Sequence, residues 1–192
     1  VHFKMEGIRT VRELLRPSDW MTTIDLSDAF HHVPLHPSHQ HAFRFRFNKQ
    51  LYQWRAMPFG YCDAPRIFTK LMRVVARVAR SRGLRIVVYL DDILLMSPTR
   101  EQCHRDTQTL IQILNDFGLN LNRLKSQLVP SQQRAYLGVD IDSSSMSFSL
   151  PLTKLKKFTH QANLLAGRAS KGKRIGLKTL RSIVGVFQSA AD

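Results

Sequence analysis

The sequence predicts an α+β fold in which helices cover one side of a β-sheet. Strand and helix patterns alternate along the first 150 of the 192 residues, as expected for a sheet backed by helices. Hydrophobic residues make up 43% and charged residues 22% of the chain, which excludes intrinsic disorder and provides for a buried core. No apolar run approaches the roughly 20 residues that a membrane-spanning helix needs, so we expect no membrane partner. The two cysteines, Cys62 and Cys103, form no CxxC motif, which argues against a disulfide framework and a cysteine zinc site.

The first strands are predicted from β-forming and alternating residues. Residues 22–26 are rich in β-forming side chains. Residues 43–47 alternate aromatic and basic side chains with a period of two. This alternation predicts a half-buried strand that turns at residues 48–50.

A long amphipathic helix is predicted to follow Asp63, an N-cap residue, with Pro65 in its first turn, and to end before Gly83. Its apolar residues recur at helical spacing and are expected to face the core: Ile67, Phe68, Leu71, Met72, Val75 and Val78. The opposite face is basic and consists of Arg66, Lys70, Arg73, Arg77 and Arg80. We interpret it as a solvated helix face in preference to a phosphate-binding stripe.

The next elements are predicted from one apolar run and two local signals. Residues 85–96 predict two strands that flank an acidic pair. Thr99, with Gln102 three residues later, predicts a capping box that opens a helix ending at Gly118. Residues 135–141 predict a further strand.

Charge divides the chain into two predicted domains, residues 1–150 and 151–192. The polar residues 142–145 predict a turn shortly before this boundary. The second part carries nine Lys and Arg against one acid, which is +8 of the net charge of +15. It predicts two helices, at about residues 153–165 and 177–189, around a basic loop suited to a nucleic-acid backbone. The net charge favours a polyanionic partner, and a merely soluble basic protein is the alternative.

Asp91 and Asp92 are the strongest candidates for a functional site. They interrupt an apolar run, where burying an unpaired carboxylate costs several kcal/mol. A divalent cation would offset that cost, and oxygen ligands with little Cys or His nearby favour Mg²⁺ or Mn²⁺ over zinc. An Asp-containing β-turn without a metal is the alternative. Asp25, in another apolar strand, is the candidate third acid for a two-ion site, whereas Asp28 is equally explained as a cap of a short turn.

Five histidines fall within eleven residues: His31, His32, His36, His39 and His41. Their spacing matches no tetrahedral motif with Cys or Glu partners. We therefore expect no zinc site in this segment.

Five motifs in a fixed order carry a resemblance to a known family. They are residues 24–30 (IDLSDAF), 57–60 (MPFG), 89–92 (YLDD), Gly118-Leu119 with Lys125, and 136–138 (YLG). These segments resemble a reverse transcriptase palm, most closely that of LTR-type and tyrosine-recombinase (DIRS-type) retrotransposons. The resemblance implies an antiparallel sheet backed by helices with an RRM-like core. It also implies partial fingers within residues 1–150 and a helical thumb segment in residues 151–192.

The resemblance implies a role for each matching residue. Asp25 and Asp91 would ligate Mg²⁺, which Mn²⁺ can replace, and Asp92 completes the acidic cluster. Lys125 matches the lysine proposed to protonate the leaving pyrophosphate. The implied nucleotide-binding residues are Asp28, Ala29, Phe30, Phe59 and Gly60. Of these, Phe30 matches the aromatic residue that excludes a 2′-hydroxyl, and Phe59 stands where the retroviral branch has Gln. The implied primer and template contacts are Tyr89, Leu90, Tyr136, Leu137, Gly138, Lys171, Lys173 and Arg174.

The implied function is that of an RNA-directed DNA polymerase, which adds dNMP from dNTP to a primer 3′ end on an RNA or DNA template. A non-catalytic nucleic-acid-binding remnant of a retroelement polymerase is the alternative. Only 24 residues precede Asp25, and they lack the fingers hairpin that binds the triphosphate in the family. We therefore expect weak or no primer extension by these 192 residues alone. The first residues contain no apolar leader, so we expect an intracellular fragment of a longer protein.

Overall fold

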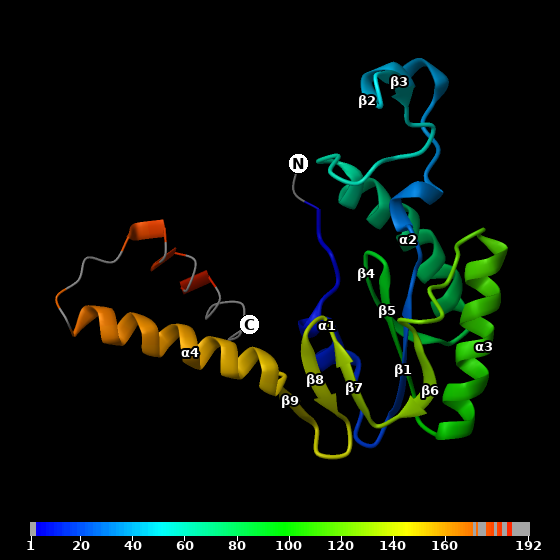
Figure 1. Cartoon of the computed structure of the whole chain (residues 1–192). Coiled ribbons are helices and arrows are strands. Elements are labelled where there is room, and N and C mark those ends of the chain that lie inside the picture. Colours follow the sequence, from blue (N-terminus) through cyan, green and yellow to red (C-terminus); the bar gives the residue numbers. More distant parts are fainter. Residues whose placement is uncertain (1–2, 171, 173–175, 179, 182–183, 186–192) are drawn as a thin grey trace.

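A four-stranded antiparallel sheet forms the centre of the computed structural model, which describes residues 3–170, 172, 176–178, 180–181 and 184–185. The strand order is β4-β5-β1-β6 (Figure 1). These strands are β4 (Arg85–Tyr89), β5 (Asp92–Ser97), β1 (Trp20–Asp25) and β6 (Gln127–Ser131). The predicted α+β class is confirmed.

Two long helices cover one face of this sheet, as predicted. They are α2 (Ala64–Ser81) and α3 (Arg100–Asp116). Ile93 and Leu95 of β5 lie in one buried cluster with side chains of both helices, including Phe68 and Leu110. This cluster is the larger of the two hydrophobic cores.

The opposite face of the sheet is covered as well, which the sequence did not indicate. Helix α1 (Ile8–Leu14) and a second sheet of β7 (Gln133–Tyr136), β8 (Val139–Asp142) and β9 (Ser147–Ser149) form this cover. Leu94 and Met96 of β5 pack here with Val11, Tyr136 and Ile141. Successive residues of β5 therefore enter different cores, which explains why this central strand is a continuous apolar run.

The single strand predicted over residues 135–141 is wrong, because the chain reverses direction within it. β7 and β8 pair antiparallel from Gln133↔Asp142 to Tyr136↔Val139, with Leu137 and Gly138 as the two turn residues. Both have positive φ, +48° and +74°, as a type I′ hairpin turn requires. Leucine rarely adopts this conformation, so Gly138 was the only turn signal in the sequence.

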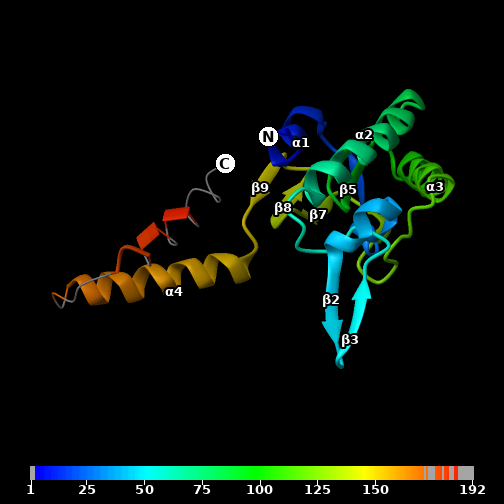
Figure 2. The same cartoon turned by 90° about the horizontal axis from the view of Figure 1, so that it is seen from above.

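The strand predicted over residues 43–47 as half-buried belongs to an exposed two-stranded ribbon. The ribbon follows two 3₁₀ helices, η1 (Ala29–His32) and η2 (Pro37–Phe43), and consists of β2 (Arg44–Phe47) and β3 (Gln50–Gln53). All eight strand residues are exposed, and Figures 1 and 2 show the ribbon projecting from the body. The alternation of aromatic and basic residues indicates that the two kinds of side chain point to opposite faces of the strand. It does not indicate whether another part of the protein covers either face.

The predicted helix starts are placed correctly, although their caps differ. Thr99 accepts a hydrogen bond from the Gln102 amide at 3.1 Å, which confirms the N-cap, whereas the Gln102 side chain donates to Asp106 at 2.6 Å in place of completing the predicted capping box. Asp63 precedes α2, but its carboxylate accepts a hydrogen bond from Arg66 at 3.0 Å instead of capping the helix.

The basic face of α2 is not simply solvated. Arg73 donates to the Lys4 carbonyl at 3.0 Å, and Arg80 pairs with Glu6 at 2.7 Å. Both arginines remain exposed, as the prediction of a solvated face requires, and their contacts also hold the N-terminal segment against the body.

The basic C-terminal part begins with α4 (Leu152–Ala169), which extends away from the sheets (Figures 1 and 2). This helix is longer than the predicted span of residues 153–165. The second predicted helix, residues 177–189, lies largely outside the described residues. Within the described ranges, no helix combines the length and apolar character needed to span a membrane.

Candidate active site

The pairing of β1 with β5 brings two of the predicted acids together. The register runs from Trp20↔Ser97 to Asp25↔Asp92, so the last residue of β1 lies opposite the first residue of β5. Directly opposed residues of an antiparallel pair point to the same face, with Cβ atoms about 4.5–5.5 Å apart. Asp25 and Asp92 therefore share one face of the sheet at the end of the β4–β5 hairpin.

Asp91 lies in the two-residue turn of this hairpin, beside Leu90. Leu90 has a φ of +53°, and Tyr89 and Asp92 pair across the turn. The Asp91 carbonyl accepts a hydrogen bond from the Leu26 amide at 3.0 Å, one residue beyond Asp25. This bond fastens the turn to the end of β1.

The backbone of Asp25 is also held by the segment that carries Lys125. The Asp25 amide donates to the Ser126 hydroxyl at 3.0 Å, and the Asp25 carbonyl accepts from the Asn122 amide at 2.8 Å. Asn122 and Ser126 were not predicted as site residues, because they belong to no recognisable motif and their hydrogen bonds to Asp25 involve only its backbone.

The acids repel one another, and Lys125 partly compensates. Burial is the main cause that raises the pKa of Asp92 from 3.8 to about 6, and the charges of Asp91 and Asp25 add to it. The positive charge of Lys125 acts in the opposite direction. Asp25, Asp92 and Lys125 line one cavity of about 120 Å³, together with Gln127 and Tyr136.

The donor chemistry of this site fits a hard divalent cation. Asp25, Asp91 and Asp92 offer carboxylate oxygens, the charges of Asp91 and Asp25 disfavour ionised Asp92, and Lys125 is the cation that acts on Asp92. In the described part of the chain, no group of three or more His, Cys, Asp or Glu side chains is already arranged to hold a metal ion. The site's suitability for a divalent cation is therefore argued from its carboxylate oxygens and from its excess of negative charge.

The predicted nucleotide-binding residues lie in two neighbouring segments. The Phe30 ring contacts Phe59 at 5.0 Å and the buried Phe68 at 5.8 Å between centroids. Phe59 is 61% exposed, and Gly60 has a φ of +87° with open space where a side chain would lie. This loop offers an exposed ring beside a backbone that a ligand can approach closely.

Asp28 and Ala29 are placed differently from these aromatic residues. Asp28 has a φ of +48° and makes no side-chain capping bond, so the cap interpretation is not supported. Its carboxylate lies 3.9 Å from His31 Nδ1. Ala29 is buried in the core, so its side chain is not available to a nucleotide.

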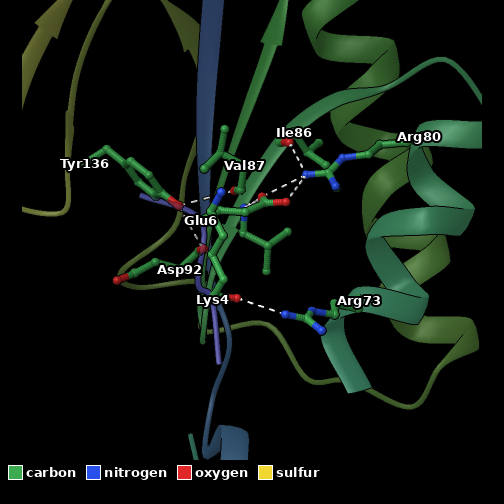
Figure 3. A network of polar contacts seen from close by, with 9 residues as sticks. Lys4, Glu6, Arg73, Arg80, Ile86, Val87, Asp92 and Tyr136 are labelled. Carbon is green, nitrogen blue, oxygen red and sulfur yellow. Dashed lines mark hydrogen bonds and ion pairs between the residues drawn. The ribbon is translucent and has the colours of Figure 1, made fainter. Parts of the chain in front are cut away.

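The three residues of the 136–138 motif have different environments. Leu137 and Gly138 form the β7–β8 turn, and Leu137 lines the cavity with Asp25 and Asp92. Lys154 donates to the Gly138 carbonyl at 3.0 Å. Tyr136 is only 4% exposed, and its hydroxyl donates toward the carbonyls of Val87 (3.2 Å) and Asp92 (3.1 Å), as Figure 3 shows. A primer cannot reach the Tyr136 hydroxyl in this arrangement.

Of the remaining predicted contacts, Tyr89 and Leu90 are partly buried at the hairpin end. Lys171, Lys173 and Arg174 lie outside the described residues.

The clustered histidines have individual contacts. His31 stacks on Trp54 with 5.2 Å between ring centroids. His32 accepts a hydrogen bond from the Asn120 amide at 3.1 Å, and His36 accepts one from the Ser38 amide at 3.3 Å. These contacts account for three of the five histidines without a metal.

Comparison with known proteins agrees with this geometry. Residues 1–141 match the family model described as reverse transcriptase (RNA-dependent DNA polymerase). The Gag-Pol polyprotein of Walleye dermal sarcoma virus is 35% identical over 131 residues, which is 67% of this chain and 7% of that protein. The Gag-Pro-Pol polyprotein of Human T-cell leukemia virus 2 is 30% identical over 187 residues, which is 90% of this chain and 13% of that protein. The chain thus spans a small part of both relatives.

Solved structures show the same fold. The foamy viral protease-reverse transcriptase in complex with an RNA/DNA hybrid has a TM-score of 0.77 and 23% identity, covering 98% of this chain and 23% of that one. The foamy viral protease-reverse transcriptase dRH in complex with double-stranded DNA has a TM-score of 0.79 and 22% identity, covering 98% of this chain and 30% of that one. The retroviral relatives agree with the LTR-type part of the resemblance. From the family match over residues 1–141 and the ordered motifs on this palm, we conclude that the chain belongs to the reverse transcriptase (RNA-dependent DNA polymerase) family.

Proposed function

We propose that this chain forms the polymerase site of an RNA-directed DNA polymerase, which transfers dNMP from dNTP to the 3′-hydroxyl of a primer. The observation that carries the proposal is the Asp25↔Asp92 pair at the end of the β4–β5 hairpin, with Lys125 in the same cavity. A structural turn would not need a partly buried Asp92 beside Asp91 and Asp25, whose charges add to the rise in the pKa of Asp92.

Asp25, Asp91 and Asp92 are the residues that would hold Mg²⁺, with Mn²⁺ as a substitute. When bound, such ions neutralise the triphosphate and lower the pKa of the attacking hydroxyl. Lys125 places a positive charge on the same side, where negative charge develops on the leaving pyrophosphate. We propose that its ammonium group gives that oxygen a proton.

The incoming nucleotide is proposed to lie against Phe30 and Phe59. The Phe30 ring, held by Phe68, supports the sugar and leaves no room for a 2′-hydroxyl. Phe59 packs against the nucleotide without a polar contact, because its ring has no hydrogen-bond donor. The positive φ at Gly60 lets the backbone approach the base pair.

The proposed partner is a primer bound to an RNA or DNA template. The foamy viral neighbours are described in complex with an RNA/DNA hybrid and with double-stranded DNA.

In this chain, residues 29–62 contain no Asp or Glu but include Arg44, Arg46, Lys49 and Arg55. The β2–β3 ribbon carries Phe45, paired with Tyr52, on one face and the two strand arginines on the other. Aromatic faces and cations together suit unpaired nucleic acid. The basic segment from residue 151 is proposed to follow the duplex as the start of a thumb.

Single-nucleotide primer extension with Mn²⁺ tests the polymerase proposal. The 192-residue chain is expected to extend a primer slowly and only with the template-complementary dNTP. Asp25→Asn is expected to lower that rate by at least about 100-fold, because it removes a charge that the transition state requires. Asp140→Asn, an exposed acid on β8, serves as the matched control and should leave the rate unchanged.

The same experiment separates the alternative function. If the 192 residues bind primer-template but add no nucleotide with either ion, the assay is repeated with the triphosphate-binding fingers of a reverse transcriptase fused in front of residue 1. Binding without extension by that fusion would identify a binding module, and the polymerase proposal would then fail. Extension that survives Asp25→Asn at the wild-type rate would also contradict it.

A further inference from the structure

The hairpin that carries the acids is held by side chains from two sides, and one of these side chains, that of Glu6, lies outside the motifs that carry the family resemblance. Tyr136 reaches it from β7, and Glu6 reaches it from the N-terminal segment (Figure 3). The two residues are 130 positions apart in the sequence, yet both bond to backbone groups within residues 87–92.

On the first side, the Tyr136 hydroxyl lies between two carbonyls of the hairpin. The Val87 carbonyl belongs to β4 and the Asp92 carbonyl to β5, at 3.2 and 3.1 Å. A phenol has one proton, so the two acceptors share it. One buried hydroxyl therefore joins both strands of the hairpin at the residue that faces Asp25.

On the second side, Glu6 and Arg80 complete the free edge of the sheet. β4 is an edge strand, and its Ile86 and Val88 direct backbone groups away from β5. The Val88 amide donates to Glu6 at 2.8 Å, and Arg80 donates both to Glu6 at 2.7 Å and to the Ile86 carbonyl at 2.9 Å. This pair of side chains replaces the missing neighbouring strand.

We infer that Tyr136 and Glu6 are positioning residues, which hold the β4–β5 hairpin from two sides so that Asp92 stays opposite Asp25. This inference rests on the proposed function for its catalytic consequence. It also assigns Tyr136 to the hairpin and not to the primer, in contrast to the role that the family resemblance implies.

The first test compares Tyr136→Phe with the wild-type chain. The variant keeps the ring in its core and loses only the hydroxyl. Amide hydrogen exchange in residues 86–93 is expected to accelerate, and kcat for single-nucleotide extension to fall about tenfold, since small displacements of reacting groups are costly. The Kd for primer-template and the KM for dNTP should stay within about twofold of wild type, because no ligand contact is removed.

Thr107→Val is the matched control for this variant. Thr107 also has a buried hydroxyl, which pairs with Thr22 at 2.8 Å on the far part of the sheet. Its loss should lower the urea midpoint of unfolding without accelerating exchange in residues 86–93 or changing kcat. A merely structural role for Tyr136 would make the two variants behave alike, which would overturn the inference.

The second test removes the other support. Glu6→Ala is expected to accelerate exchange at Val88 and its neighbours. Glu13→Ala, which breaks an exposed pair with Arg9 on α1, should leave exchange there unchanged. Unchanged exchange in both Tyr136→Phe and Glu6→Ala would overturn the inference, as would a weakened primer-template Kd with unchanged kcat in Tyr136→Phe. If the wild-type chain adds no nucleotide, the exchange measurements still decide the positioning role, and the proposed function is decided separately by its own primer-extension test.

Discussion

At the scale of single residues, Asp92 shows the conflict between folding and function most clearly. Its carboxylate is half-buried beside two other acids, and these causes raise its pKa from 3.8 to about 6. A raised pKa means that the fold disfavours the ionised form. In the absence of divalent ions, this carboxylate therefore destabilises the protein at neutral pH.

The pH dependence of unfolding tests this conclusion. Below pH 3.8, Asp92 is protonated in both the folded and the unfolded state, so it does not change the free energy of unfolding. Between pH 3.8 and about 6, the folded state binds more protons than the unfolded state, so stability falls as the pH rises. Above about pH 6, the full cost of ionising Asp92 in the folded state is present. Asp92→Asn is therefore expected to raise the free energy of unfolding at neutral pH in EDTA. We expect a gain of about 1 kcal/mol, reduced from the larger value that the shift alone would give because water screens a half-exposed group.

Urea titrations near neutral pH and below pH 3.8 measure the effect. The gain should vanish at the lower pH, and Asp140→Asn should show no such difference. An equal gain from Asp92→Asn at both pH values would contradict the assigned cause.

At the scale of elements, the sequence predicted helices whose apolar residues recur at regular spacing. It did not predict elements that are defined by contacts with residues distant in the sequence. The apolar spacing of residues 67–78 and the Thr99 cap led directly to α2 and α3. The β7–β8 hairpin was missed because Leu137 occupies a left-handed conformation that leucine seldom adopts. The role of Glu6 could not be predicted, because a single acid in an irregular segment has no pattern and its partners, Arg80 and Val88, are distant in sequence.

The β2–β3 ribbon provides a prediction at this scale. If Arg44 and Arg46 contact phosphates of single-stranded template, replacing either by Ala should reduce the slope of log Kd against log salt by roughly 0.7. Fluorescence anisotropy with a labelled oligonucleotide at several salt concentrations measures this slope. Arg9→Ala, a comparably exposed arginine on α1, should not change it. Ribbon variants with the wild-type slope would show that this surface is used for another partner.

At the scale of the whole molecule, two cores on opposite faces of one sheet bring the distant acids together. Asp25 ends a strand whose neighbour begins with Asp92, and both strands are buried between the α2–α3 layer and the layer of α1 with β7–β9. The sequence showed that each acid lies in an apolar strand, but the register that places them face to face is a property of the folded sheet. The family resemblance supplied that expectation, and the Asp25↔Asp92 pairing agrees with it.

The most direct test of the account is a Mn²⁺ titration of the 192-residue chain, followed by the loss of the free-ion signal in electron paramagnetic resonance. The wild-type chain and Asp140→Asn are expected to bind Mn²⁺ alike. Asp25→Asn and Asp92→Asn should each weaken binding by at least about tenfold, because even the loss of an outer-shell partner has effects of this size. Equal Mn²⁺ affinity in all four proteins would contradict the claim that these carboxylates form a shared divalent-cation site.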